Sequence, residues 1–116
     1  MPVLLRPCDL PHCTLVPMPA EVDLYNRPDL FDGIRRIVDG RAGRIDFLVL
    51  DFSETVFMDS QGVSLIDAVR AHLRGLPGEP GLRVVAGARI VRRVLDITHA
   101  RRDVAVYEDA SEALFA

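Results

Sequence analysis

The sequence predicts an α/β sandwich, in which about four helices pack on a mixed, mostly parallel sheet of about five strands. Apolar runs of strand length alternate along the chain with longer amphipathic segments that have a helical period. The central run, residues 46–52, is apolar at almost every position, which is typical of a strand buried on both faces. A length of 116 residues with 49% apolar residues suits a single domain over residues 1–116.

The first part of the chain predicts two strands and a helix. Residues 2–6 and 14–18 are short apolar runs separated by turn-forming residues, which indicates two strands joined by a turn. Asn26 precedes Pro28, a combination typical of a helix cap followed by the first helical turn. The helix is expected to end near Gly40 and to bury five apolar side chains at helical spacing: Leu30, Phe31, Ile34, Ile37 and Val38.

A second strand–helix pair follows in the middle of the chain. After the central strand, a connector at residues 53–57 leads to an amphipathic helix at residues 63–73. A loop rich in glycine and proline, residues 75–81, separates this helix from another buried strand at residues 82–86. The side chains expected to face the core from this helix are Val63, Ile66, Val69 and Leu73.

The last part predicts a helix at residues 88–97, a short strand at residues 104–107 and a C-terminal helix at residues 110–115 that Asp109 caps. The first of these helices is expected to turn four side chains inward: Ile90, Val91, Val94 and Leu95. The element order β-β-α-β-α-β-α-β-α predicts a sheet that is parallel except at its first strand.

The charged residues exclude several classes of function. The formal net charge of −3 is too small to indicate a nucleic-acid surface, and all 14 basic residues are arginine. Without lysine, the chain forms neither a Schiff base nor a P-loop phosphate site. No apolar run approaches the roughly 20 residues of a membrane helix, and no signal peptide is recognisable, so we expect no membrane insertion.

The two cysteines, Cys8 and Cys13, are interpreted as reduced thiols of a cytosolic protein, because a chain with this much apolar core does not depend on disulfides. Their spacing matches no metal signature. His12 is next to Cys13, but the other two histidines fall in different elements. We therefore expect neither a metal site nor a cofactor.

The residues between the central strand and the following helix are the most informative in the chain. Residues 58–62 read Met-Asp-Ser-Gln-Gly, which places Ser60 at the entrance of a helix. Backbone N–H groups at this position lack partners within the helix, and the helix dipole favours negative charge there. The hydroxyl of Ser60 can cap the helix, or it can carry a phosphate that the helix tolerates.

With its flanks, this loop resembles the STAS domain, specifically that of the bacterial anti-sigma factor antagonists. Residues 57–62 resemble the family's Phe-Met-Asp-Ser-Ser-Gly signature, whose serine is the phosphoacceptor. Residues 21–23 resemble a Gly-Glu-Leu-Asp turn, residues 26–30 a Thr-Ala-Pro-Glu-Leu helix start, and residues 94–98 a Leu-Phe-Asp-Met-Ser stretch. The resemblance covers most of the chain, from about residue 14 to the C-terminus.

The resemblance implies a STAS-like sandwich that is not an enzyme and does not bind nucleic acid. Such a domain binds a serine kinase of the histidine-kinase-like ATPase fold, which is also an anti-sigma factor, and thereby releases a sigma factor in the cytoplasm. The kinase phosphorylates the serine, here Ser60, and releases the domain, and a protein phosphatase restores it. The partner-binding residues implied in this way are Asp23, Met58, Asp59, Ser60, Gln61 and Gly62.

Simpler structural roles remain open for several of these residues. Ser60 can be only a helix cap, Asp59 a second cap and Asp23 a turn residue. In the functional interpretation, Met58 is an apolar contact on the loop, and Gly62 allows another backbone to approach closely.

Three alternative functions start from the same region. Asp51 ends the central strand like the phosphoacceptor of a receiver domain, but that site requires a lysine, which the chain lacks. Ser60 follows a strand as a hydrolase nucleophile does, but Met58 replaces the first glycine of G-x-S-x-G and no histidine is obviously placed as a base. A STAS scaffold that is never phosphorylated, such as a subunit of a stress-signalling or lipid-transport complex, stays open.

Overall fold

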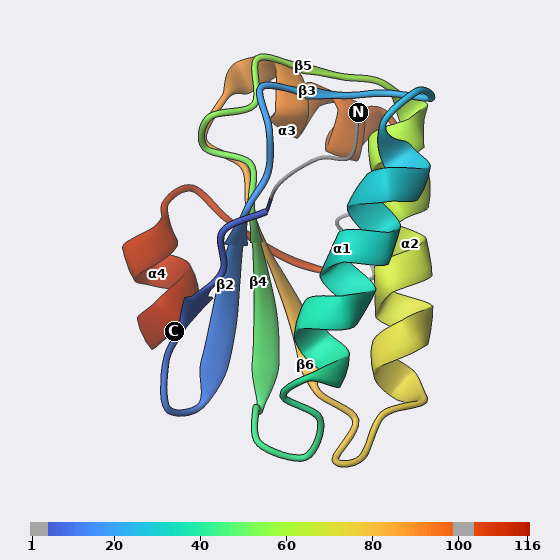
Figure 1. The fold of residues 1–116 in the computed structure, drawn as a ribbon. Helices are drawn as coiled ribbons and strands as arrows, with labels where there is room; N and C mark the ends of the chain where they lie inside the picture. Colours follow the sequence, from blue (N-terminus) through green and yellow to red (C-terminus); the bar gives the residue numbers. More distant parts are fainter. Residues whose placement is uncertain (1–4, 99–103) are drawn as a thin grey trace.

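A five-stranded sheet forms the centre of the computed structural model, which describes residues 5–98 and 104–116 (Figure 1). The strand order is β1-β2-β4-β6-β7. β1 runs antiparallel to β2, and all other neighbours are parallel, as the sequence predicts. The strands are β1 (Cys8–Asp9), β2 (Cys13–Pro17), β4 (Phe47–Asp51), β6 (Gly81–Val85) and β7 (Ala105–Tyr107).

Within the described residues, four helices pack around this sheet, which confirms the predicted α/β sandwich (Figure 1). α1 (Arg27–Asp39) and α2 (Ser60–Arg74) lie side by side on one face and start at the same end of the molecule. α4 (Ala110–Phe115) covers the opposite face, and its cap is the predicted one, because Asp109 Oδ1 accepts a hydrogen bond from the Glu112 N–H at 2.9 Å. α3 (Arg89–Ile97) lies beyond the sheet, at the end where α1 and α2 begin.

The central strand β4 is buried on both faces, as its continuous apolar sequence predicts. Leu48 and Leu50 point into the larger core, which the sheet forms with α1, α2 and α3. Val49 points the other way, into a smaller core that it shares with Ala113 of α4. The two-sided burial follows from the alternation of side chains along a strand that has helices on both sides.

The parallel register brings the C-terminal ends of three strands to one edge of the sheet. Pro17, Asp51 and Val85 are aligned there on β2, β4 and β6. The pairing continues for one residue beyond the strands, since the Met18 N–H donates to the Asp51 carbonyl at 2.8 Å and the Phe52 N–H donates to the Val85 carbonyl at 2.9 Å. From this edge the chain enters the segments that carry the residues singled out by the sequence.

A second, two-stranded sheet lies above this edge and was not predicted. β3 (Glu21–Val22) pairs in parallel with β5 (Phe57–Met58), with Glu21 opposite Phe57 and Val22 opposite Met58 (Figure 1). The sequence predicts only a turn and a connector in these segments. Two-residue strands are too short to show a periodic pattern, so only the tertiary contact reveals them.

Some predicted boundaries are wrong. The first strand was expected at residues 2–6, of which only 5 and 6 are described. Neither is in a strand, and β1 follows at Cys8–Asp9. α2 begins at Ser60 rather than at Val63, because Asp59 caps it. On α3, Ile90 is exposed instead of inward, since Val91 and Leu95 form the buried stripe of this short helix.

Candidate functional site

Ser60 is the first residue of α2, and its neighbour Asp59 is the residue that caps the helix. Asp59 Oδ1 accepts a hydrogen bond from the Gln61 N–H at 2.8 Å. The Ser60 side chain is exposed, and its Oγ has no hydrogen-bond partner among the described residues. The capping role considered for Ser60 is therefore wrong and the one considered for Asp59 is confirmed, which leaves the Ser60 hydroxyl free at the helix tip.

Asp23 organises the turn between β3 and α1. Its Oδ1 accepts hydrogen bonds from the Tyr25 N–H at 2.9 Å and from the Asn26 N–H at 3.1 Å. Asn26 reciprocates, because its Oδ1 accepts from the Asp23 N–H at 3.0 Å and its Nδ2 donates to the Glu21 carbonyl at 2.7 Å. Asn26 occupies the predicted cap position of α1, but its side chain binds the turn instead of the helix. The turn role of Asp23 is confirmed.

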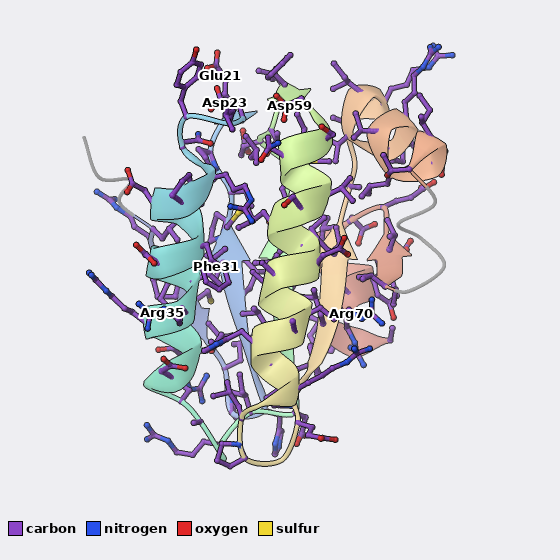
Figure 2. The ribbon with its side chains drawn as sticks, turned by 90° about the vertical axis from the view of Figure 1, so that its right-hand side faces the viewer. Glu21, Asp23, Phe31, Arg35, Asp59 and Arg70 are labelled. Atoms are coloured by element: carbon purple, nitrogen blue, oxygen red, sulfur yellow. The ribbon has the colours of Figure 1, made fainter. Side chains whose placement is uncertain are left out.

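The β3–β5 pairing brings the Asp23 turn and the Ser60 loop together. Because Val22 lies opposite Met58, the next residue of each strand, Asp23 and Asp59, leaves the small sheet at the same point. The Asp59 N–H also donates to the Val22 carbonyl at 3.4 Å. Figure 2 shows Glu21, Asp23 and Asp59 at one end of the molecule, above α1 and α2. The structure thus joins two segments that lie about 35 residues apart in the sequence.

Met58 does not present its side chain to a partner, so this part of the prediction is wrong. Only 2% of Met58 is exposed, and it packs in the main core. Successive side chains of β5 point to opposite sides, so Phe57 faces outward while Met58 faces inward. Gly62 is also buried, and it is Met58 that approaches it closely, from inside the protein.

Four exposed apolar side chains in the paired segments were not predicted as part of the site. They come from the two segments that the small sheet pairs, and Tyr25 is the most exposed at 90%. We call this group the apolar rim, and it consists of Leu24, Tyr25, Val56 and Phe57. Exposed apolar groups next to a polar loop are typical of a protein-binding surface. The signal in the sequence was their position in expected turns and connectors, where no core face exists to bury them.

Two other kinds of site are not found in the described part of the chain. No group of three or more histidine, cysteine, aspartate or glutamate side chains there is arranged to hold a metal ion. No helix within residues 5–98 and 104–116 has the length and apolar character needed to cross a membrane.

The model of the STAS domain family matches residues 9–113. The chain belongs to the STAS domain family. The match includes the small sheet, the Ser60 loop and α2, so the STAS domain contains the whole of the site described above. No protein of curated function is significantly similar to the chain in sequence.

This STAS domain is similar in structure to solved proteins. An anti-sigma factor antagonist from Mycobacterium paratuberculosis is 25% identical, with a TM-score of 0.81 over 96% of this chain and 90% of that one. A STAS domain protein from Planctomyces limnophilus is 15% identical, with a TM-score of 0.77 over 95% of this chain and 93% of that one. The Bacillus cell fate determinant SpoIIAA in its phosphorylated form is 15% identical, with a TM-score of 0.66 over 96% of each chain. The last two likenesses establish the fold alone.

Proposed function

We propose that this STAS domain is a cytoplasmic anti-sigma factor antagonist that is switched by phosphorylation of Ser60. The unphosphorylated domain binds a kinase-type anti-sigma factor of the histidine-kinase-like ATPase fold and thereby releases a sigma factor. The kinase phosphorylates Ser60 and the complex dissociates, and a protein phosphatase restores the binding form. The similarity to the mycobacterial anti-sigma factor antagonist supports this role.

The observation that carries the proposal is the free hydroxyl of Ser60. A phosphoacceptor must be accessible, and the fold must not depend on its hydroxyl. Ser60 meets both conditions, because it is exposed and Asp59 performs the capping. No described side chain hydrogen-bonds Ser60 Oγ, so the serine lacks the adjacent base that activates a hydrolase nucleophile. An acceptor of phosphate explains this geometry better than a nucleophile does.

The apolar rim is the surface through which we propose that the domain binds its partner. We propose that a partner covers the apolar area of Leu24, Tyr25, Val56 and Phe57 together with the Ser60 loop, which follows β5 directly. Asp23 and Asp59 hold the two loops in place, and we propose that Asp23 and Gln61 also contact the partner at the edge of this surface. Met58 and Gly62 support the surface from beneath, because both are buried.

Phosphorylation acts on the complex more than on the fold. A phosphate adds about −1.5 to −2 charges at neutral pH. The N-terminus of the 15-residue helix α2 tolerates this charge. A partner surface that covers the apolar rim does not, because it must strip water from the phosphate. Each ~1.4 kcal/mol of this cost weakens binding tenfold.

The experiment that tests the proposal measures phosphate transfer. The domain is incubated with its cognate kinase-type anti-sigma factor and ATP, and its mass is followed. Wild type and Ser111→Ala, which removes an exposed serine on α4, should each gain one phosphate, whereas Ser60→Ala should gain none. A wild-type domain that binds the kinase but stays unmodified would instead be a STAS scaffold that is never phosphorylated.

A further inference from the structure

Arg27 joins the N-terminal ends of α1 and α2. It is the first residue of α1, and its Nε–H donates a hydrogen bond to Ser64 Oγ of α2 at 3.1 Å. The side chain is partly buried between the helices. Within the described residues, its guanidinium makes no ion pair and uses only this one of its five N–H donors. Arg27 is thus a cation whose partner is a neutral hydroxyl.

The partner of Arg27 lies one helical turn from the proposed phosphoacceptor. Ser60 and Ser64 are four residues apart on α2, so they share a face of the helix with about 5–6 Å between their Cβ atoms. Side chains on a helix lean toward its N-terminus, so the Ser64 Oγ that accepts from Arg27 lies on the side of Ser64 that is nearer to Ser60. We therefore expect that a rotation of the long Arg27 side chain brings its unused Nη groups to a phosphate on Ser60.

We propose that Arg27 is the internal counter-charge of phosphorylated Ser60. On phosphorylation, the guanidinium turns from Ser64 to the phosphate and holds it with the charge-assisted, bidentate hydrogen bonds that arginine forms with phosphate. The inference rests on the proposed function, which makes Ser60 the modified residue. It explains how a dianion is accommodated beside the carboxylates of Asp23 and Asp59, which lie at the same end of the molecule (Figure 2).

Other charged groups at this end of the molecule also affect the stability of the phosphate dianion. Asp59 and Asp23 disfavour the phosphate dianion, and Arg27 favours it. The carboxylate of Asp23 is engaged by the backbone of its own turn, so it does not neutralise Arg27. On the other side, α3 packs against α2 and β5 and carries Arg89, Arg92 and Arg93, of which Arg92 pairs with Glu108 at 3.3 Å.

The test titrates the phosphate itself. Phosphoserine is inserted at position 60 during translation, so no kinase is needed, and its second pKa is measured by ³¹P NMR. A nearby cation stabilises the dianion and lowers this pKa, so Arg27→Met should raise it by about half a unit. Arg27→Lys keeps the positive charge and loses the two parallel N–H donors of the guanidinium, so it should raise the phosphate pKa less than Arg27→Met does. Arg35→Met is the matched control, because Arg35 lies two turns further along α1 and pairs with Asp32 at 3.7 Å (Figure 2).

Two results would overturn the inference. One is an unchanged phosphate pKa in Arg27→Met, even if that variant melts at a lower temperature with and without the phosphate, since Arg27 would then only connect two helices. The other is a pKa shift in Arg93→Met that exceeds the shift in Arg27→Met. A kinase that never modifies Ser60 would refute the proposed function and leave this titration intact, so the two failures are distinguishable.

Discussion

The buried side chain of Met58 fills the space that any side chain at Gly62 would need. A Cβ on Gly62 would lie 2.3 Å from Met58 Cγ and 2.4 Å from its Sδ. Met58 cannot turn outward, because it is 2% exposed and enclosed by the main core. The glycine after the Ser60 loop is thus required by packing inside the domain, which fixes where α2 begins against β5.

Gly62→Ala should destabilise the domain by about 1–3 kcal/mol, the usual cost of overpacking a core. The helix propensity of alanine, about 1 kcal/mol better than that of glycine, offsets only part of this cost. Urea denaturation measures the difference. In a Met58→Ala background the clash is removed, so the same Gly62→Ala change should cost much less or stabilise. Equal costs in both backgrounds would show that the two residues do not compete for space.

Asp59 and Ser60 should differ sharply in their effect on stability. Asp59→Ala removes the hydrogen bond to the Gln61 N–H and should cost about 1 kcal/mol. Asp59→Asn keeps a capping oxygen and should cost less. Ser60→Ala removes a hydroxyl without a described partner and should change stability by less than about 0.5 kcal/mol. If denaturation shows that Ser60→Ala lowers the free energy of unfolding more than Asp59→Ala does, Ser60 would be the residue that caps α2.

The architecture could be predicted from the sequence because the hydrophobic patterns of the main strands and helices extend over many consecutive residues. The run at residues 46–52 is apolar on both faces, and the helices show regular spacing, so the sheet and its layers follow. It also placed Ser60 at a helix tip and Asp23 in a turn. It could not show that β3 and β5 pair, and without that pairing it could not tell that Phe57 faces outward while Met58 is core. The choice between Asp59 and Ser60 as cap depends on backbone angles that residue types do not fix.

The two cysteines should react with thiol reagents at different rates. Cys8 is exposed, whereas Cys13 is buried, and neither is in a disulfide. Burial raises the pKa of the Cys13 thiol, and the nearby Arg41 and Arg83 offset this only in part. A raised pKa leaves less thiolate at a given pH. The Cys8→Ser variant, which keeps only Cys13, should therefore be labelled at pH 8 at a rate at least about tenfold lower than the Cys13→Ser variant, which keeps only Cys8. Similar rates would mean that the β1–β2 hairpin opens readily.

The apolar rim should contribute to the affinity for the partner and not to the stability of the fold. Tyr25→Ala removes a side chain that is 90% exposed, so the fold should be unaffected while affinity for the cognate kinase-type anti-sigma factor falls about tenfold or more. Calorimetry measures the affinity and thermal denaturation the stability. Phe115→Ala is the control, since Phe115 is 84% exposed on α4, which covers the other face of the sheet. The surface is misassigned if Phe115→Ala weakens binding as much as Tyr25→Ala.

The most direct test of the account compares the affinity of the cognate kinase-type anti-sigma factor for the domain before and after Ser60 is fully phosphorylated. Calorimetry is done with ADP bound to the kinase, so no phosphate is transferred during the measurement. The phosphate should weaken binding by about 100-fold or more, which corresponds to about 2.7 kcal/mol, while the domain stays folded. Ser60→Asp should weaken binding in the same direction, and Ser60→Ala should bind as wild type does. An affinity that changes by less than about twofold on phosphorylation would contradict the switch.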